Sequence, residues 1–415
     1  MTAICAKSEL CIFSPSPAQG VIDSAVFADI HPTALIDGKS EMIEFMINGS
    51  QTEYLDLNDT FIYLNLKVKN KNSSDLPDAA SVTPRNYMLN ALFSDVTLSL
   101  NDTVIEGGDR LYPYKATIEN IFHFAEDTKR IQLETAGYCT DDSKRQAWVA
   151  KSGTYEMAGA LRLDFFNQAR YLIPGVNVRI RLRRSTDAFV LASGTSSQPI
   201  IEIKRAILYV RRVKVHAAVR AGHEMGMIKQ NAKYPMGRSK MISYTIGKGS
   251  MSYFKDNIFS SLRLPKFVVV GFVKARAFVG DYKSDPFNFE NFDISSVGLL
   301  LDGQAFPYRD IYTPDFENNL YTREYLTSII QNTEHLNTNL NNGITKEMFG
   351  HGGRCLFTFN LTPDLNMGLT QMPRDGNLRL DVKFAKALPE GINVVIYGLF
   401  DGEIQITKEM TVLVN

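Results

Sequence analysis

The chain has 415 residues, of which 45 are Lys or Arg and 45 are Asp or Glu. This length is sufficient for two domains of ordinary size, each with its own buried core. The zero net charge excludes bulk electrostatic attraction to nucleic acid or to an anionic membrane, so any such contact must come from a local patch. The longest apolar runs, FVVVGFV from Phe267 and INVVIYGLF from Ile392, are strand-length and too short to span a bilayer, so we expect a soluble chain with no membrane partner.

The first 38 residues are rich in Ser, Pro and Ala and have no sustained hydrophobic period, which predicts an N-terminal arm rather than a folded element. Leu10, Ile12 and Phe13 give this arm a small apolar group. We therefore predict an assembly arm that orders only against a neighbouring subunit or the inner side of an assembly of such subunits. The segment 1–20 lacks an apolar run of signal-peptide length, so secretion by that route is not expected.

Strand patterns begin at Met42 and predict a first all-β domain over 39–216. Within it, VTLSL from Val96 is followed by an Asn101/Asp102 turn, a short second strand and a helix that begins at Pro113. Residues 128–153 interrupt the strands as an irregular excursion. Residues 217–240 then lose strand character and predict a short helix and linker.

The second domain, 241–415, repeats the plan of the first. VGLLL from Val297 is followed by an Asp302/Gly303 turn, a short strand and a helix at about 321–330. Three further pairs of segments keep a similar offset: TFIYLNLKV with KFVVVGFVK, VRIRL with LRLDV, and AILYV with VVIYG. The pattern predicts two tandem eight-stranded antiparallel β-sandwiches, each with an inserted helix. It favours jelly rolls and leaves immunoglobulin-type sandwiches open.

Reactive motifs are absent, and we predict a protein that is not an enzyme and has no catalytic, cofactor-binding or metal site. GKG at 247–249 lacks the order of a phosphate-binding loop, and GKSEM and GRSKM have Met where a nucleophile elbow needs Gly. The four cysteines have no metal-like spacing and are expected to be buried or incidental thiols. Of the six histidines, the nearest pair, His216 and His223, is predicted to consist of ordinary linker residues.

One stretch is locally basic. Between Ala160 and Arg220 there are twelve Lys or Arg and only three acidic residues. In VRIRLRR, Arg179, Arg181 and Arg183 alternate with apolar residues and so share one face of a strand, and Arg184 follows them. These four arginines either contact carboxylates within the protein or on a neighbouring subunit, or make non-specific contacts with the phosphates of DNA.

Blocks along essentially the whole chain resemble the double jelly-roll major capsid protein, or hexon, of Polinton/Maverick elements and adintoviruses. In chain order the blocks are SELCIF, IEFMINGSQTEYLDL, YPYKATIE, FFNQAR, LRRSTDAF, AKYP, GFVKARAFVGDY, PFNF, LLDGQ, LFTFNLTPDL, GNLRLDVKF and NVVIYG. The resemblance is weakest over 128–157.

The resemblance implies a double jelly roll whose homotrimer forms a pseudo-hexagonal capsomer. Capsomers would tile an icosahedral shell around a double-stranded DNA genome, in contact with neighbouring capsomers and a single jelly-roll penton protein. The implied location is the virion, after assembly inside the host cell, in its nucleus. The alternative from a different class is a carbohydrate-binding β-sandwich adhesin, with exposed aromatic residues in the loop 282–292 as its platform.

Overall fold

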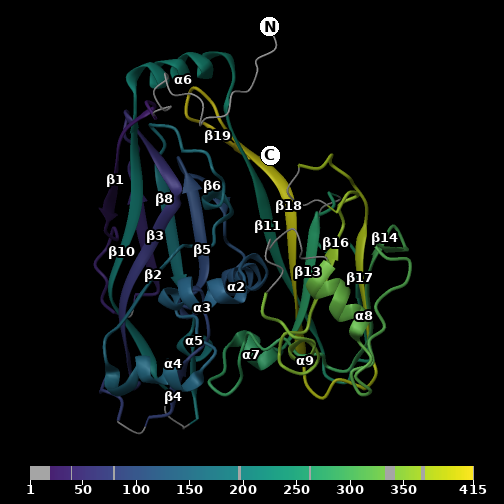
Figure 1. The fold of residues 1–415 in the computed structure, drawn as a ribbon. Coiled ribbons are helices and arrows are strands. Elements are labelled where there is room, and N and C mark those ends of the chain that lie inside the picture. The colour runs from purple at the N-terminus through teal and green to yellow at the C-terminus, as the bar shows by residue number, and fades with distance from the viewer. Residues whose placement is uncertain are drawn as a thin grey trace, which may run out of the picture.

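The computed structural model describes residues 19–38, 40–77, 80–194, 198–260, 263–331, 342–365 and 370–414. Two β-sandwiches stand side by side in these residues, with their long strands running in nearly the same direction (Figure 1). We call them roll 1 and roll 2. The arm residues Leu10, Ile12 and Phe13 lie outside the described residues.

Roll 1 contains two four-stranded antiparallel sheets, in the orders β1-β10-β3-β7 and β2-β8-β5-β6. A short pair, β4 with β9, is added at one end. The strands are β1 (Ile22–Ile30), β2 (Met42–Ile47), β3 (Glu53–Lys69), β4 (Val82–Pro84), β5 (Phe93–Leu100), β6 (Thr103–Glu106), β7 (Tyr155–Gly159), β8 (Val178–Arg184), β9 (Leu191–Ser193) and β10 (Ile200–Val215).

Roll 2 repeats this arrangement in the orders β11-β18-β13-β16 and β12-β17-β14-β15, with β19 added beside β18. Its strands are β11 (Ala232–Ile246), β12 (Ser252–Lys255), β13 (Phe267–Lys274), β14 (Ile294–Leu301), β15 (Gln304–Phe306), β16 (Leu356–Asn360), β17 (Leu378–Phe384), β18 (Ile392–Ile406) and β19 (Val412–Val414). Strand for strand, the sheet orders of the two rolls correspond. The predicted tandem repeat is confirmed, and the fold is a double jelly roll.

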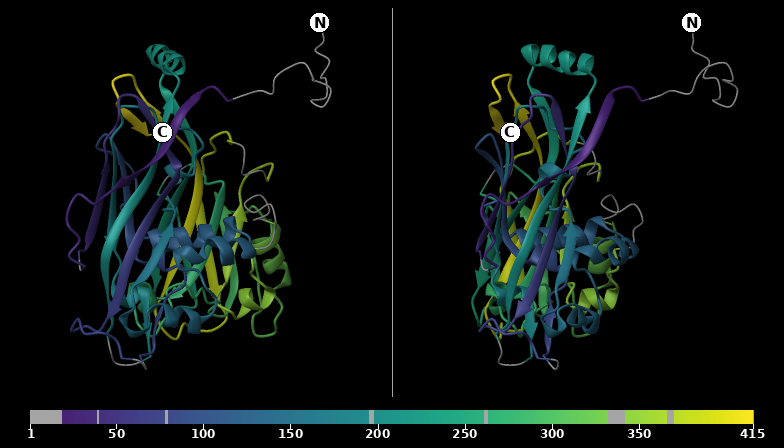
Figure 2. Two further views of the ribbon diagram at one scale, coloured as in Figure 1. Left: turned by 60° about the vertical axis from the view of Figure 1, so that its left-hand side comes forward. Right: turned by 90° about the vertical axis from the view of Figure 1, so that its left-hand side faces the viewer.

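Helices occupy the loops and one end of the molecule. Roll 1 carries α1 (Met88–Ala91), α2 (Tyr112–His123), α3 (Glu126–Gln132), η2 (Glu134–Ala136), α4 (Asp142–Trp148), η3 (Ala150–Ser152), η4 (Asp164–Phe166) and α5 (Asp187–Val190). Helix α6 (Ala217–Lys229) joins the rolls across their top (Figure 2). Roll 2 carries α7 (Ala275–Val279), α8 (Thr322–Tyr325), the π-helical turn η5 (Leu326–Ile330) and α9 (Lys346–Gly350). None of the helices in the described residues is long and apolar enough to cross a membrane.

The two predicted hairpins form where the turn residues allow them. Asn101 and Asp102 have φ of 44° and 68°, and Asp302 and Gly303 have φ of 50° and 86°. Two-residue hairpin turns of this kind need positive φ at both central positions, which Asn, Asp and Gly adopt most readily. In each roll the inserted helix comes after the hairpin, α2 after β5–β6 and α8 with η5 after β14–β15.

Alternation along the strands builds the core. In β3, every second residue from Ile62 to Val68 is fully buried between the sheets, while the residues between them are partly exposed. A strand with one face on the core and one on solvent must alternate in this way. The buried apolar residues of both rolls form one continuous cluster.

Three boundaries differ from the sequence-based expectation. The predicted arm, 1–38, includes β1, which pairs with β10 along its length although most of its side chains are exposed. The predicted linker, 217–240, includes the first part of β11, where Pro235 is tolerated because β11 pairs with β18 alone among the described strands. The excursion over 128–153 is largely helical rather than irregular.

Candidate interaction surfaces

Helix α2 lies between the two rolls and forms the centre of their contact, which we call the seam. The helix packs on β5 of its own roll and on β11 and β18 of roll 2. Every residue from Tyr112 to Phe122 is buried. A helix that is covered on all sides belongs to the interior of a protein, so α2 is part of the packed interface between the rolls.

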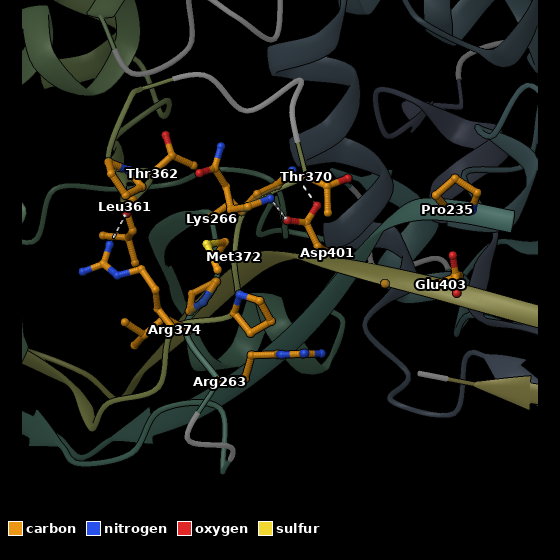
Figure 3. Close-up of a pocket in the computed structure, with 16 residues that line it drawn as sticks. Pro235, Arg263, Lys266, Leu361, Thr362, Thr370, Met372, Arg374, Asp401 and Glu403 are labelled. Carbon is orange, nitrogen blue, oxygen red and sulfur yellow. Dashed lines mark hydrogen bonds and ion pairs between the residues drawn. The ribbon is translucent and has the colours of Figure 1, made fainter. Parts of the chain in front are cut away.

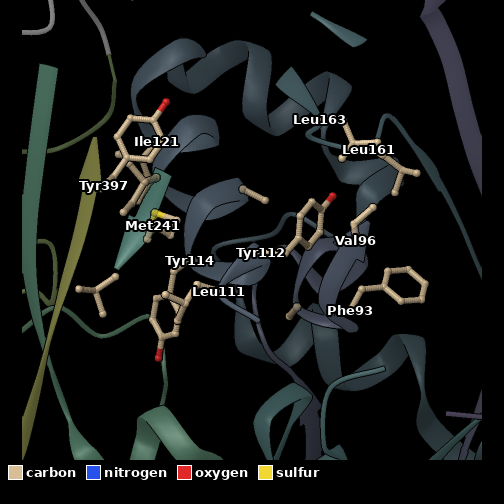
Figure 4. Close-up of a cluster of buried hydrophobic side chains, with 14 of the residues drawn as sticks. Phe93, Val96, Leu111, Tyr112, Tyr114, Ile121, Leu161, Leu163, Met241 and Tyr397 are labelled. Atoms are coloured by element: carbon tan, nitrogen blue, oxygen red, sulfur yellow. The ribbon is translucent and has the colours of Figure 1, made fainter. Parts of the chain in front are cut away.

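Aromatic residues fill one part of the seam. Tyr114 of α2 stacks on Phe278 with ring centroids 5.4 Å apart, and it meets Phe287 and Phe289 edge-on at 5.8 and 6.4 Å. Nearby, Phe122 of α2 meets Phe267 of β13 edge-on at 6.4 Å. Figure 4 shows Ile121 of α2 beside Met241 and Tyr397 of roll 2, with the Tyr114 ring pointing away from them. Offset and edge-to-face ring pairs of this kind stabilise packing beyond the area that they bury.

A buried ionic cluster fills another part of the seam. The Lys115 ammonium contacts Glu106, lies 2.8 Å from Asp164, and lies 4.0 Å from Glu119. Asp164 in turn accepts hydrogen bonds from the Ser239 backbone N–H at 2.6 Å and from the Ser239 hydroxyl at 2.9 Å. Because Ser239 belongs to β11, this cluster ties roll 1 to roll 2.

The cluster holds three carboxyl groups around one ammonium. Burial acts to lower the pKa of Lys115, but the carboxylates, Asp164 foremost, hold it well above its ordinary value. Burial raises the pKa of Glu119 to about 7. One Glu119 oxygen accepts a 3.4 Å hydrogen bond from the Tyr397 hydroxyl, and the other has no partner among the described residues. Burial, and after it the charge of Asp164, also raises the pKa of Glu106, to about 8. Contact with the Lys115 ammonium favours the charged form of Glu106, whereas Glu119 lies 4.0 Å from the ammonium and has one oxygen without a partner among the described residues. On this geometry Glu119 is the carboxyl better placed to carry a proton.

Backbone carbonyls complete the seam at its lower end. One guanidinium nitrogen of Arg85 donates to the carbonyl oxygens of Asp281, Tyr282 and Ser284, at 3.2, 3.3 and 2.7 Å. Burial lowers the pKa of Arg85. A guanidinium that is shared among three carbonyls fixes the loop after α7 against roll 1.

Two histidines that the sequence placed in the linker have local structural contacts. His216 caps α6, because its Nδ1 accepts from the Ala218 N–H at 3.3 Å. The His223 Nδ1 lies 2.8 Å from the Tyr54 hydroxyl. Among the described residues, no group of three His, Cys, Asp or Glu side chains is placed to hold a metal ion.

The four arginines of the basic strand lie in two environments. Arg179 and Arg181 face outwards from β8 and share Glu44, with nitrogen–oxygen distances of 3.4 and 3.3 Å. Arg183 is exposed on the same face. Arg184 instead pairs with Asp187 at 3.2 Å and donates to the carbonyls of Gly38 and Ile201, so it joins strand ends within roll 1.

Two clefts in the described part of the chain are lined by ion pairs and backbone hydrogen bonds. One of about 310 Å³ lies at the side of roll 2, where Lys266 and Asp401 pair at 2.7 Å and Arg374 donates to the Leu361 carbonyl (Figure 3). Another, of about 500 Å³, opens between β6 of roll 1 and β11 of roll 2 beside Glu106 and Asp164. The chemistry of both is that of ion pairs and backbone hydrogen bonds.

The loop 282–292 does not form the exposed aromatic platform that the adhesin alternative requires. Phe287 and Phe289 are buried in the seam, where they contact Tyr114.

One known protein resembles the chain in sequence along most of its length. No family model matches the sequence. An uncharacterized protein of Caenorhabditis elegans is 25% identical over 377 residues, which cover 86% of this chain and 89% of that protein.

Solved structures resemble the chain from end to end. A chain of the Sputnik virophage matches with a TM-score of 0.62 and 11% identity, over 100% of this chain and 93% of its own. The mavirus major capsid protein matches at 0.57 and 10%, over 99% and 93%. The Faustovirus major capsid protein matches at 0.59 and 8%, over 95% and 93%. The chain therefore shares its double jelly-roll fold with viral major capsid proteins.

Proposed function

We propose that this protein is a structural major capsid protein, a subunit of an icosahedral shell. The observation that carries the proposal is the repeated roll. Two jelly rolls with the same sheet order stand side by side, joined by a seam that buries helix α2 from Tyr112 to Phe122. In this duplicated sandwich, buried polar residues hold the two rolls in a fixed relative position. This arrangement suits a structural subunit better than a binding or catalytic domain.

The proposed capsomer is a homotrimer. Three copies of a twice-repeated chain present six similar rolls, and so match six neighbours in a shell. The fold shared with the mavirus and Faustovirus major capsid proteins supports the proposal. The sequence blocks support the finer assignment to the capsid proteins of Polinton/Maverick elements and adintoviruses, with a penton protein as partner, a double-stranded DNA genome inside and assembly in the host nucleus.

Electron microscopy of the purified protein tests the proposal. Shells or flat hexagonal sheets are expected after concentration of the trimer. A discrete oligomer that binds glycans on an array and never forms shells or sheets would favour the adhesin instead.

We propose that the outward-facing arginines have a second, separable role. Arg181 shares Glu44 with Arg179 and is partly exposed, and Arg183 is more exposed, so both remain available for phosphate at the shell's inner side. Replacing both with Gln is expected to reduce DNA retention in intact shells. Loss of the trimer with unchanged, salt-dependent DNA binding would leave only a structural role.

A further inference from the structure

Partly exposed aromatic side chains gather on roll 1, on the side facing away from roll 2. Phe27 of β1, Phe61 of β3 and Tyr209 of β10 lie together on the outer face of their sheet. The ring centroids of Phe27 and Phe61 are 6.0 Å apart, and those of Phe61 and Tyr209 are 4.9 Å apart. Phe27 is 52% exposed. We call these three residues the aromatic face; its strands are seen at the left of Figure 1.

The corresponding face of roll 2 is covered by helix α2 of the same chain. The repeat aligns Phe61 with Phe267 and Tyr209 with Tyr397. Phe267 and Tyr397 are only 1% and 3% exposed. Helix α2 of roll 1 covers them, with Phe122 on the Phe267 ring and Glu119 on the Tyr397 hydroxyl. In roll 2, therefore, this sheet face is closed by the helix of the adjacent roll.

Roll 2 carries the matching helix, and two of its apolar side chains are partly exposed. Helix α8 and η5 follow the β14–β15 hairpin as α2 follows β5–β6. Leu326 and Ile330, about one turn apart, are 43% and 37% exposed, whereas Phe122 of α2 is 1% exposed. In Figure 1, α8 lies in front of the strands of roll 2, whereas α2 lies between the two rolls. We call Leu326 and Ile330 the η5 stripe.

On the basis of the trimer in the proposed function, we propose that the η5 stripe of one copy packs on the aromatic face of the next copy. The contact repeats between chains the relation that α2 makes within the chain. It is a head-to-tail contact, in which the two copies use different surfaces, and such contacts form rings when the rotation closes. Three copies would then alternate roll 1 and roll 2 around one ring of six.

The surroundings of the aromatic face suit such an interface. Arg211 on the same face pairs with Asp56 at 2.6 Å and with Asp59 at 3.1 Å, so this cation is already compensated within the chain. An apolar centre with a polar rim is the usual anatomy of a specific protein interface. Contiguous exposed aromatic surface on a soluble protein commonly marks an interaction site.

Two double variants and two controls test the contact by light scattering. Leu326→Glu with Ile330→Glu damages the stripe, and Phe27→Glu with Tyr209→Glu damages the face. Each is expected to lower the mass threefold, from trimer to monomer, with a melting temperature that shows the fold intact. The control substitutions Ile131→Glu and Met225→Glu change side chains that are even more exposed, at 74% and 63%, and should leave the trimer mass unchanged.

Mixing the two double variants distinguishes a head-to-tail contact from a symmetric one. Each mixed pair retains one intact stripe and one intact face, so a dimer of twice the chain mass is expected, without a closed trimer. If the wild-type protein is a trimer and both double variants are trimers as well, this contact is wrong and the proposed function is unaffected. A wild-type chain that is monomeric overturns the proposed function, and this contact with it.

Discussion

Lys115 is the cation at the centre of the seam's buried ionic cluster, because Glu106, Asp164 and Glu119 surround its ammonium. A buried ion pair adds little net stability compared with an apolar replacement of both partners. Removing one partner is costly, because the other charge is then left buried without compensation. The cluster therefore fixes the relative position of the two rolls and adds little net stability to the fold.

Replacing Lys115 with Met tests this directly. The variant leaves buried carboxyl groups without their cation, and we expect a loss of about 3–5 kcal/mol in the free energy of unfolding. Denaturant unfolding measures it. Lys144→Met is the matched control, because Lys144 is exposed on α4 and its loss should change stability by no more than about 0.5 kcal/mol. Equal effects of the two substitutions would contradict the account.

Glu119 makes stability depend on pH in a defined direction. Burial raises its pKa from an ordinary value of 4.5 to about 7, so the folded state holds this proton more tightly than the unfolded state. The stability from this group is complete below about pH 4.5 and is lost as the pH rises through about 7.

Replacing Glu119 with Gln should therefore stabilise the protein at pH 8 and have little effect near pH 4.5. Gln keeps a carbonyl oxygen for the Tyr397 hydroxyl and carries no charge. The expected difference at pH 8 is on the order of 3 kcal/mol or less, from the linkage between pKa and stability. Thermal unfolding of both proteins across this pH range measures it, and a gap that does not vary with pH would refute the assignment.

At the scale of the elements, backbone conformation explains why the hairpins could be predicted. The Asp302/Gly303 signal is local, and the observed positive φ values are those the turn needs. Helix α4 was missed although Asp141 is a recognisable cap, whose carboxylate accepts from the N–H groups of Ser143 and Lys144. Strand β1 was missed because its exposed side chains leave no burial pattern to read.

The seam shows where prediction from one sequence stops. Lys115 and Glu119 are spaced as a pair on one helix face, which is a readable signal. Glu106, Asp164 and Ser239 come from separate parts of the chain, and only the folded topology brings them together. The predicted arginine face of β8 was right in its geometry because strand alternation is local, but the partners Glu44 and Asp187 could not be read from it.

A pair of glycine substitutions isolates the backbone contribution. An added Cβ would meet nothing within 4 Å at either Gly303 or Gly222, but Gly303 has φ of 86° and Gly222 lies in α6. Gly303→Ala should destabilise by about 1 kcal/mol through strain, whereas Gly222→Ala should stabilise by about 0.5–1 kcal/mol. Thermal unfolding decides, and effects of the same sign would be inconsistent with a turn of this type.

Truncation separates the arm from β1. Deleting residues 1–18 should leave the melting temperature nearly unchanged and impair shell formation, as predicted for an assembly arm. Deleting residues 1–38 also removes β1 and leaves one edge of β10 unpaired, so a lower melting temperature is expected. Normal shell assembly by the shorter truncation would refute the role of the arm.

At the scale of the whole molecule, duplication accounts for both the internal seam and the free surfaces. Within the chain, α2 closes the outer face of the next roll, while at the two ends an aromatic face and the η5 stripe stay uncovered. The two uncovered surfaces of such a chain differ from each other, and they match as α2 and the sheet of roll 2 match within the chain. Closure into a ring satisfies both ends at once.

Cryo-electron microscopy of the purified full chain is the measurement that tests the capsomer most directly. The account predicts class averages of threefold particles with a hexagonal outline, in which six jelly rolls alternate around the axis and α8 with η5 lies against the β1-β10-β3 sheet of the next copy. Monomers across micromolar concentrations, or a twofold particle joined through other surfaces, would contradict it.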